Sequence, residues 1–327
     1  MCTCGLIYAL LACPALPDDP EKRDRTPSPV VLLEAPRTFR LRIGMRLHAA
    51  DGAIQRAVAA VAIPMEWPEQ QVRVLSTEHP AGSQIQTRRA GDTAEQLLLR
   101  LPRLSAGSSA VVVRTFEITR WTQRADPAAL SRLSAVPANQ VRAYLQPSDG
   151  IESTHPEIRR FASEAVGDMS DTLARARALF DATREHVKYV EGPFAGALAG
   201  LRTGQGDCEE RTCLFIALCR ASGIPARLVW GPGHCWSEIA LSDSDGKIVW
   251  VPADPTKEKE IGRISHFYPI VQKGDRFRVP EFPDRQMRYL TPYCSGVGPK
   301  PKIESIEEQE SGESESLAKP PARDTRP

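Results

Sequence analysis

The stretch GQGDCEERTCLFIALCRASGIPAR, residues 204–227, predicts a helix that is buried on every side. Asp207 is a short polar residue of the kind that caps a helix N-terminus, and Glu210 can complete a capping box. The helix should therefore begin at the residue after Asp207. Gly223 and then Pro225 predict its end. The residues between these signals are apolar on all faces, which is typical of a helix packed inside a domain.

The residue at this predicted start is Cys208, and its position favours a reactive thiol. A cysteine reacts as its thiolate, and the unpaired N–H groups and positive dipole end of a helix N-terminus lower a thiol's pKa. Gly204 and Gly206 precede it and leave room for another backbone to approach. Cys213 and Cys219 lie in the apolar middle of the helix and are expected to be small buried hydrophobic residues.

A small antiparallel sheet is expected after the helix. Residues 226–230 predict a strand that ends at the glycine-containing break 231–233. Residues 234–241 and 247–254 predict a hairpin around the sequence DSDG at 243–246.

The register of this hairpin brings an imidazole and a carboxylate together. A three-residue loop closed by Ser242 and Gly246 places His234 directly opposite Asp254. A four-residue loop closed by Ser242 and Lys247 shifts the register by one residue and leaves the two as neighbours. Cross-strand Cβ atoms lie about 4.5–5.5 Å apart, so either register lets Asp254 orient His234.

A thiol, an imidazole and a carboxylate in this arrangement suit nucleophilic catalysis. Cys208 would attack a carbonyl, His234 would hold the ion pair and protonate the leaving amine, and Asp254 would fix the imidazole tautomer. Each residue alone has an ordinary structural interpretation. The combination favours the catalytic hypothesis.

These blocks resemble the transglutaminase-like superfamily. The resemblance implies a papain-like α+β core, in which the nucleophile helix packs on an antiparallel sheet, and acyl transfer from an amide through a thioester. It implies that Cys208 is the nucleophile, His234 the base and acid, and Asp254 the orienting residue. It covers roughly residues 155–275 and is carried by Gly206-Asp-Cys208, Arg220 to Arg227, His234-Cys-Trp236-Ser-Glu238 and Trp250-Val-Pro-Ala-Asp254-Pro.

Acyl transfer also needs donors for the carbonyl oxygen, on which negative charge develops. The backbone N–H of Cys208 is the natural first donor, and either Tyr189 or Gln205 could supply a second. Trp236 shares the strand face of His234 by alternation and is expected to shield the ion pair or contact substrate.

No cofactor and no metal are expected. The candidate zinc ligands Cys213, Cys219, His234 and Cys235 include no C-x-x-C pair, and the two in the helix face different ways. Cys235 points to the face opposite His234 and is expected to be structural. No acidic loop with calcium-ligand spacing is present in the sequence.

The rest of the chain predicts a second, all-β unit. Short alternating segments such as residues 39–43 and 111–118, with turn residues between them, predict an antiparallel β-sandwich. The expected division is an apolar run and disordered linker over 1–36, the sandwich over 37–125, a connector over 126–150, the catalytic domain over 151–295 and a disordered tail over 296–327.

The N-terminal run GLIYALLAC, residues 5–13, is too short to span a bilayer but long enough for the apolar part of a signal peptide. Leu10-Leu11-Ala12-Cys13 resembles a bacterial lipobox, which predicts membrane attachment by lipidation at Cys13. No Lys or Arg precedes the run, which argues against a signal peptide. An exported or cell-envelope lipoprotein is favoured over a cytoplasmic protein.

Charge and chemistry limit the partners. The chain has 42 Lys and Arg against 41 Asp and Glu, a net charge of +1, so nucleic-acid binding is not expected. The expected substrate is a protein or peptide. Hydrolysis is favoured over protein-glutamine amine transfer (crosslinking), because water is always present as an acceptor. The alternative from another class is a binding or scaffold module that keeps the fold without turnover.

Overall fold

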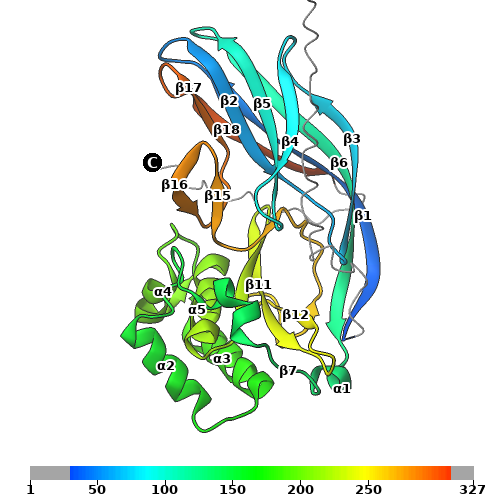
Figure 1. Cartoon of the computed structure of the whole chain (residues 1–327), viewed down its shortest axis with the longest axis vertical. Helices are drawn as coiled ribbons and strands as arrows, with labels where there is room; N and C mark the ends of the chain where they lie inside the picture. Colours follow the sequence, from blue (N-terminus) through cyan, green and yellow to red (C-terminus); the bar gives the residue numbers. More distant parts are fainter. Residues whose placement is uncertain (1–29, 311–327) are drawn as a thin grey trace, which may run out of the picture.

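The computed structural model describes residues 30–310. The strands between residues 31 and 125 form most of two antiparallel sheets that share one core, the N-terminal sheets (Figure 1). Along β1, Leu41, Ile43, Met45 and Leu47 are buried at alternate positions, as expected for a strand with one face on a core. One sheet has the order β13-β6-β1-β18 with β3 also paired to β6, and the other has the order β17-β2-β5-β4. The strands are β1 (Val31–His48), β2 (Ile54–Ile63), β3 (Gln70–Glu78), β4 (Gln84–Arg89), β5 (Glu95–Leu104), β6 (Ser109–Ala125), β13 (Arg263–Ile264), β17 (Tyr293–Val297) and β18 (Lys302–Glu310).

The C-terminal part of the chain returns to these sheets. Strand β17 pairs with β2, and β18 pairs with β1. The prediction of a disordered tail over 296–327 is therefore wrong as far as residue 310, and its remainder lies outside the described residues. The charged sequence of β18 looked like a tail, but its glutamates lie opposite arginines of β1, such as Glu304 opposite Arg46 and Glu308 opposite Arg42.

Two expected boundaries also need correction. Strand β1 begins at Val31, inside the expected linker, whose residues 1–29 lie outside the described part of the chain. The hairpin of β15 (Phe277–Val279) and β16 (Phe282–Met287) contributes Phe277 and Val279 to the core of the N-terminal sheets. The expected catalytic segment therefore extends too far toward the C-terminus.

The other half combines helices with a third antiparallel sheet, which confirms the α+β fold class (Figure 1). This sheet has the order β12-β11-β10-β14, with β7 also paired to β11. Its strands are β7 (Ser134–Ala135), β10 (Ala226–Gly231), β11 (His234–Ser242), β12 (Ile248–Ala253) and β14 (Gln272–Lys273). The helices are α1 (Pro127–Leu130), α2 (Pro156–Val166), α3 (Thr172–His186), α4 (Ala197–Thr203) and α5 (Cys208–Ala221), with 3-10 turns at Ala138–Gln140 and Arg142–Leu145 and a parallel pair of β8 (Lys188–Tyr189) and β9 (Gln205–Gly206).

Helix α5 begins and ends where the sequence predicts. The backbone N–H of Asp207 donates to Glu210 Oε2 at 3.0 Å, and the capping box is complete. Gly223 follows the helix with φ of +76°, a conformation that favours glycine. The residues between are buried on all faces against α2, α3 and the sheet. The central helix of the predicted core is therefore confirmed.

The hairpin exists, but neither expected register is right. Ser242 pairs with Ile248, so the loop has the five residues 243–247. Asp243 Oδ1 accepts hydrogen bonds from the backbone N–H groups of Asp245 at 3.0 Å and Lys247 at 2.9 Å, which stabilises this longer turn.

The two halves are joined by buried polar contacts. Gln70 exchanges hydrogen bonds with the backbone of Ile270, at 2.6 and 2.8 Å. Lys273 lies between Glu69 at 2.7 Å and Glu238 at 2.5 Å, and all three side chains are buried. These contacts fix the N-terminal sheets against the β10–β12 sheet. No helix within residues 30–310 has the length and apolar character needed to cross a membrane.

Candidate active site

Cys208 is the first residue of α5 and is half-buried. The first N–H groups of a helix have no acceptor within the helix, so they point toward this end. Gly206 is required beside it, because a Cβ atom there would lie 2.4 Å from the Cβ of Glu210. The chain can therefore pass close to the capping glutamate and still place the thiol at the helix start.

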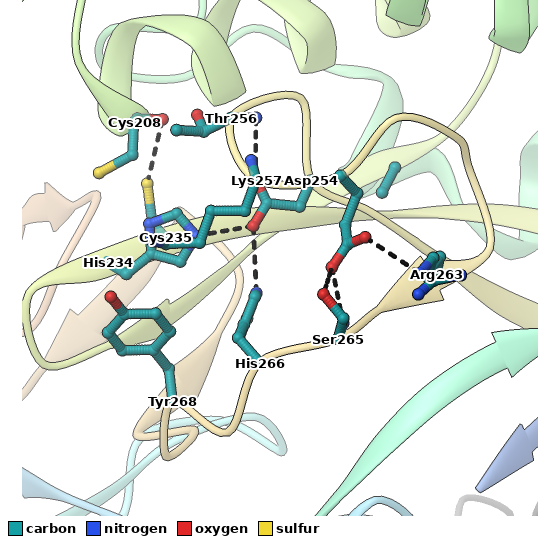
Figure 2. Close-up of polar contacts among 12 residues, drawn as sticks. Cys208, His234, Cys235, Asp254, Thr256, Lys257, Arg263, Ser265, His266 and Tyr268 are labelled. Carbon is teal, nitrogen blue, oxygen red and sulfur yellow. Dashed lines mark hydrogen bonds and ion pairs between the residues drawn. The ribbon is translucent and has the colours of Figure 1, made fainter. Parts of the chain in front are cut away.

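His234 and Asp254 are hydrogen-bonded, with His234 Nε2 2.7 Å from Asp254 Oδ2, and both side chains are buried (Figure 2). His234 opens β11, and Asp254 follows the last residue of β12. In the observed register the two are diagonal rather than direct neighbours, a separation that an imidazole can still span. The predicted pair therefore meets, although the predicted register is wrong.

The thiol and the imidazole shift each other's pKa in opposite directions. A hydrogen bond from Cys235, and then the hydrogen bond and charge of His234, outweigh burial and lower the pKa of Cys208 to about 4. Burial would lower the pKa of His234, but the charge and hydrogen bond of Asp254, together with Cys208, raise it to about 9. Between these values the pair is a thiolate and an imidazolium.

Asp254 is held in its charged form. Burial alone would raise its pKa, but the charge of His234 and hydrogen bonds from His234 and His266 hold it well below the usual range of a carboxyl group. Since Nε2 of His234 is engaged by this carboxylate, Nδ1 is the nitrogen left for Cys208.

Cys235 has a larger part in the site than the sequence suggested. It does lie on the strand face opposite His234, in the core beneath α5, as alternation predicted. The N-terminus of α5 crosses that face, and the Sγ of Cys235 therefore donates to the backbone oxygen of Cys208 at 3.5 Å (Figure 2). Cys235 is also the leading cause of the low pKa of Cys208. An alternation pattern cannot reveal this contact.

Tyr189 and Gln205, the two candidates for the second oxyanion donor, lie on the paired strands β8 and β9 but differ in their partners. Tyr189 is half exposed and lies opposite Gly206 in the β8–β9 pair, and the pKa of its hydroxyl is raised by burial and then by the Cys208 charge. Gln205 is exposed, and its backbone N–H donates to Thr203 Oγ1 at 3.2 Å. Both remain candidates for the second oxyanion donor.

Trp236 is only 1% exposed and stacks beside His234, with ring centroids 5.9 Å apart. It therefore shields the imidazole, as expected, and it does not form a surface for substrate.

Two residues that the sequence analysis did not select complete the site. His266 Nε2 lies 3.1 Å from the same Asp254 Oδ2 that His234 contacts. The ring of Tyr268 packs against His234 with a centroid distance of 4.9 Å (Figure 2). Both lie in a segment without regular secondary structure, so the only sequence signal was the aromatic cluster His266-Phe-Tyr268.

Within residues 30–310, His234, Asp254 and His266 form a group whose candidate ligand atoms all lie within 4.8 Å of one another. These atoms already hydrogen-bond to each other. A zinc ion, which needs bonds of about 2.0–2.2 Å to each ligand, would have to replace both hydrogen bonds. A metal bound there by Nε2 of His234 would also separate the imidazole from Asp254.

Comparisons with known proteins bear on the fold and on the region that contains Cys208, His234 and Asp254. Residues 159–255 match a family model described as the transglutaminase-like superfamily. A crystal structure from Cytophaga hutchinsonii, described as a "putative cysteine protease", is similar over 88% of this chain and 96% of that chain, with 14% identity and a TM-score of 0.58, which shows a shared fold. No curated protein matches the chain.

Two further solved structures match with TM-scores below 0.5, which are too low to show a shared fold. One, from Parabacteroides distasonis, is described as a "putative protease" and has 14% identity over 64% of this chain and 42% of that chain, with a TM-score of 0.27. The other is the periplasmic domain of TgpA from Pseudomonas aeruginosa bound to ethylmercury, with 17% identity over 68% of this chain and 90% of that chain, and a TM-score of 0.34.

Proposed function

Because the chain carries a transglutaminase-like domain, we propose that it is a cysteine-dependent enzyme that cleaves amide bonds of proteins or peptides through a thioester acyl-enzyme. In this proposal Cys208 is the nucleophile, His234 the acid and base, and Asp254 the residue that orients His234. The observation that carries it is the buried hydrogen bond of 2.7 Å between His234 and Asp254, beside a thiol whose pKa is lowered to about 4.

The first half-reaction uses the ion pair. The Cys208 thiolate attacks the carbonyl carbon of the amide, and a C–S bond forms as the C=O electrons move onto oxygen. His234 gives its Nδ1 proton to the amide nitrogen, the C–N bond breaks, and the amine leaves. Asp254 stays ionised and holds the Nε2 proton throughout, so that Nδ1 keeps facing the sulfur.

The second half-reaction returns the enzyme to its starting state. His234, now neutral, takes a proton from water, and the hydroxide adds to the thioester carbonyl. The C–S bond breaks to give a carboxylic acid, and Cys208 leaves as the thiolate beside the imidazolium. An amine in place of water would give a new amide, which is the alternative outcome of the same site.

The developing oxyanion needs donors within hydrogen-bonding distance. The backbone N–H of Cys208, at the first turn of α5, is the first donor in this proposal. Tyr189 is the preferred second donor over Gln205, because its hydroxyl interacts electrostatically with Cys208.

The test uses the full chain, fluorescein-labelled casein and a dansylated primary amine. We expect new casein N-termini and little amine incorporation, because water is available at every turnover while an amine must compete for the thioester. The matched variants are Cys208→Ala, which should abolish cleavage, and Cys213→Ala, which removes a buried thiol of the same helix and should retain it.

The products separate the alternatives. Incorporation of the dansyl group without chain cleavage would replace hydrolysis by amine transfer. If casein is unchanged, and the parent and Cys208→Ala proteins also react identically with a peptide aldehyde, which forms a thiohemiacetal with a reactive thiol, the chain is a binding or scaffold module and the proposal fails.

A further inference from the structure

The carboxylate of Asp254 accepts four hydrogen bonds. Oδ2 accepts from Nε2 of His234 at 2.7 Å and from Nε2 of His266 at 3.1 Å. Oδ1 accepts from the backbone N–H groups of Thr256 at 2.8 Å and Lys257 at 3.0 Å. Each oxygen therefore has two donors, which fix the plane of the carboxylate as well as its position (Figure 2).

The protonation state of His266 follows from its partners. Its Nε2 faces an ionised carboxylate and so carries a hydrogen, whereas its Nδ1 is buried without a hydrogen-bond partner. Burial is the main cause that lowers the pKa of His266 to about 4, and the positive charges of His234 and Arg120 act in the same direction. At neutral pH the ring donates to Asp254 without adding a positive charge, so His234 remains the imidazolium.

The His266 ring also forms one wall of the site. It meets the rings of His234 at 5.2 Å, Trp236 at 5.0 Å and Tyr268 at 5.0 Å between centroids, each edge-on. Removal of the ring would therefore free His234 on one side and Asp254 at one oxygen.

The N-terminal sheets hold the segment that carries His266. Arg120 of β6 is buried and donates to the backbone oxygen of Tyr268 at 3.0 Å. Gln70 at the start of β3 is buried and exchanges two hydrogen bonds with the backbone of Ile270. His266 lies beyond the residues 159–255 that match the family model, so this support is not part of the matched region.

We propose that His266 is a positioning residue: its neutral ring donates a hydrogen bond to Asp254 and thereby holds the carboxylate that orients His234, in a segment fixed by the N-terminal sheets. The inference rests on the proposed function, since it describes how the imidazolium is kept beside Cys208. A mobile carboxylate would let His234 turn away, and the thiolate would lose its nearby positive charge.

The test compares three full-length variants with the parent. His266→Ala removes the donor, His266→Gln keeps a side-chain N–H that can reach the carboxylate, and His79→Ala is the control at an exposed histidine of the N-terminal half. Two quantities are measured: the iodoacetamide alkylation rate of Cys208 against pH by mass spectrometry, and the melting temperature. In the parent the alkylation rate should rise as the pH passes the pKa of Cys208, which is about 4.

We expect the alkylation curve of His266→Ala to move up by at least about one pH unit, a tenfold loss of rate on its acid side, since the rate follows the thiolate fraction. His266→Gln should restore most of this loss, and His79→Ala should match the parent. A purely structural role would lower the melting temperature without moving the curve, and would overturn the inference, as would a Gln variant no better than Ala.

A ¹⁵N-histidine spectrum of the parent tests the same inference without any variant. It should show His266 as the neutral Nε2–H tautomer at neutral pH, and an imidazolium or an Nδ1–H tautomer would overturn the inference. If Cys208 of the parent reacts like an ordinary thiol, the proposed function itself fails, which is a different result from a normal parent with an unshifted His266→Ala.

Discussion

Asp254→Asn is the substitution with the most sharply defined expected consequence. Oδ1 of Asp254 accepts two backbone N–H groups, so the amide oxygen of the substituted side chain should take that place. Its NH₂ group then faces Nε2 of His234 and of His266, where an acceptor is needed. His234 loses both its charge partner and its hydrogen-bond acceptor.

The pKa of His234 gives the size of the effect. It lies at about 9, against an ordinary value of 6.5. Without the carboxylate it should fall to about 6.5 or below, a difference that corresponds to roughly 3 kcal/mol of lost preference for the imidazolium. At neutral pH the variant should therefore contain largely neutral His234.

The assay is an NMR titration of ¹⁵N-labelled histidine in the parent and in Asp254→Asn. The His234 resonance is assigned by its loss in His234→Ala, and exposed His79 serves as an internal control that should not move. A His234 titration that stays near pH 9 in the Asn variant would refute the assignment of Asp254 as the source of the raised pKa.

Substitutions at two further positions test contacts around the site and between the halves. Cys235→Ala should raise the pKa of Cys208, because the Cys235 hydrogen bond is the leading cause of its low value, and Cys235→Ser should stay closer to the parent; the alkylation rate against pH measures both. Lys273→Met leaves the carboxylates of Glu69 and Glu238 buried without their shared cation and should cost about 3–5 kcal/mol in urea unfolding at neutral pH. Burial would raise the pKa of Glu238, but the charges of Lys273 and Arg227 lower it to about 2, so the cost should shrink as the pH falls toward that value. Equal stability of variant and parent at neutral pH would contradict this expectation.

The α5 helix could be predicted in detail because its determinants are local. The cap at Asp207, the glutamate that completes it and the stop at Gly223 act within a few residues, and the structure has each of them. The places of strands β10–β12 were predictable from the glycine-containing break and the turn composition, although their register was not.

The meeting of His234 and Asp254 was predicted for a partly wrong reason. The two predicted registers require a loop of three or four residues, whereas the side chain of Asp243 stabilises a loop of five residues. The pair still meets, because a diagonal position on neighbouring strands is within reach of an imidazole. The two residues therefore meet even though the hairpin register differs from both predicted registers.

Long-range contacts could not be predicted. The pairing of β18 with β1 depends on charge partners such as Arg42 and Glu308, which are 266 residues apart in the chain, and a single sequence does not mark them as partners. The contacts of His266 and Cys235 could not be predicted for the same reason, because each residue meets its partner through the packing of separate elements. These contacts surround Cys208, His234 and Asp254, so the sequence identified the candidate residues better than their surroundings.

Whether Cys208 is a thiolate at neutral pH is tested most directly by alkylating all eight cysteines of the native chain with iodoacetamide as a function of pH, followed by mass spectrometry. We expect Cys208 to react from about pH 4 upward and to be the fastest thiol in weak acid, since burial raises the pKa values of Cys213 and Cys219. A Cys208 that becomes reactive only near the ordinary thiol pKa of about 8.5 would contradict this expectation.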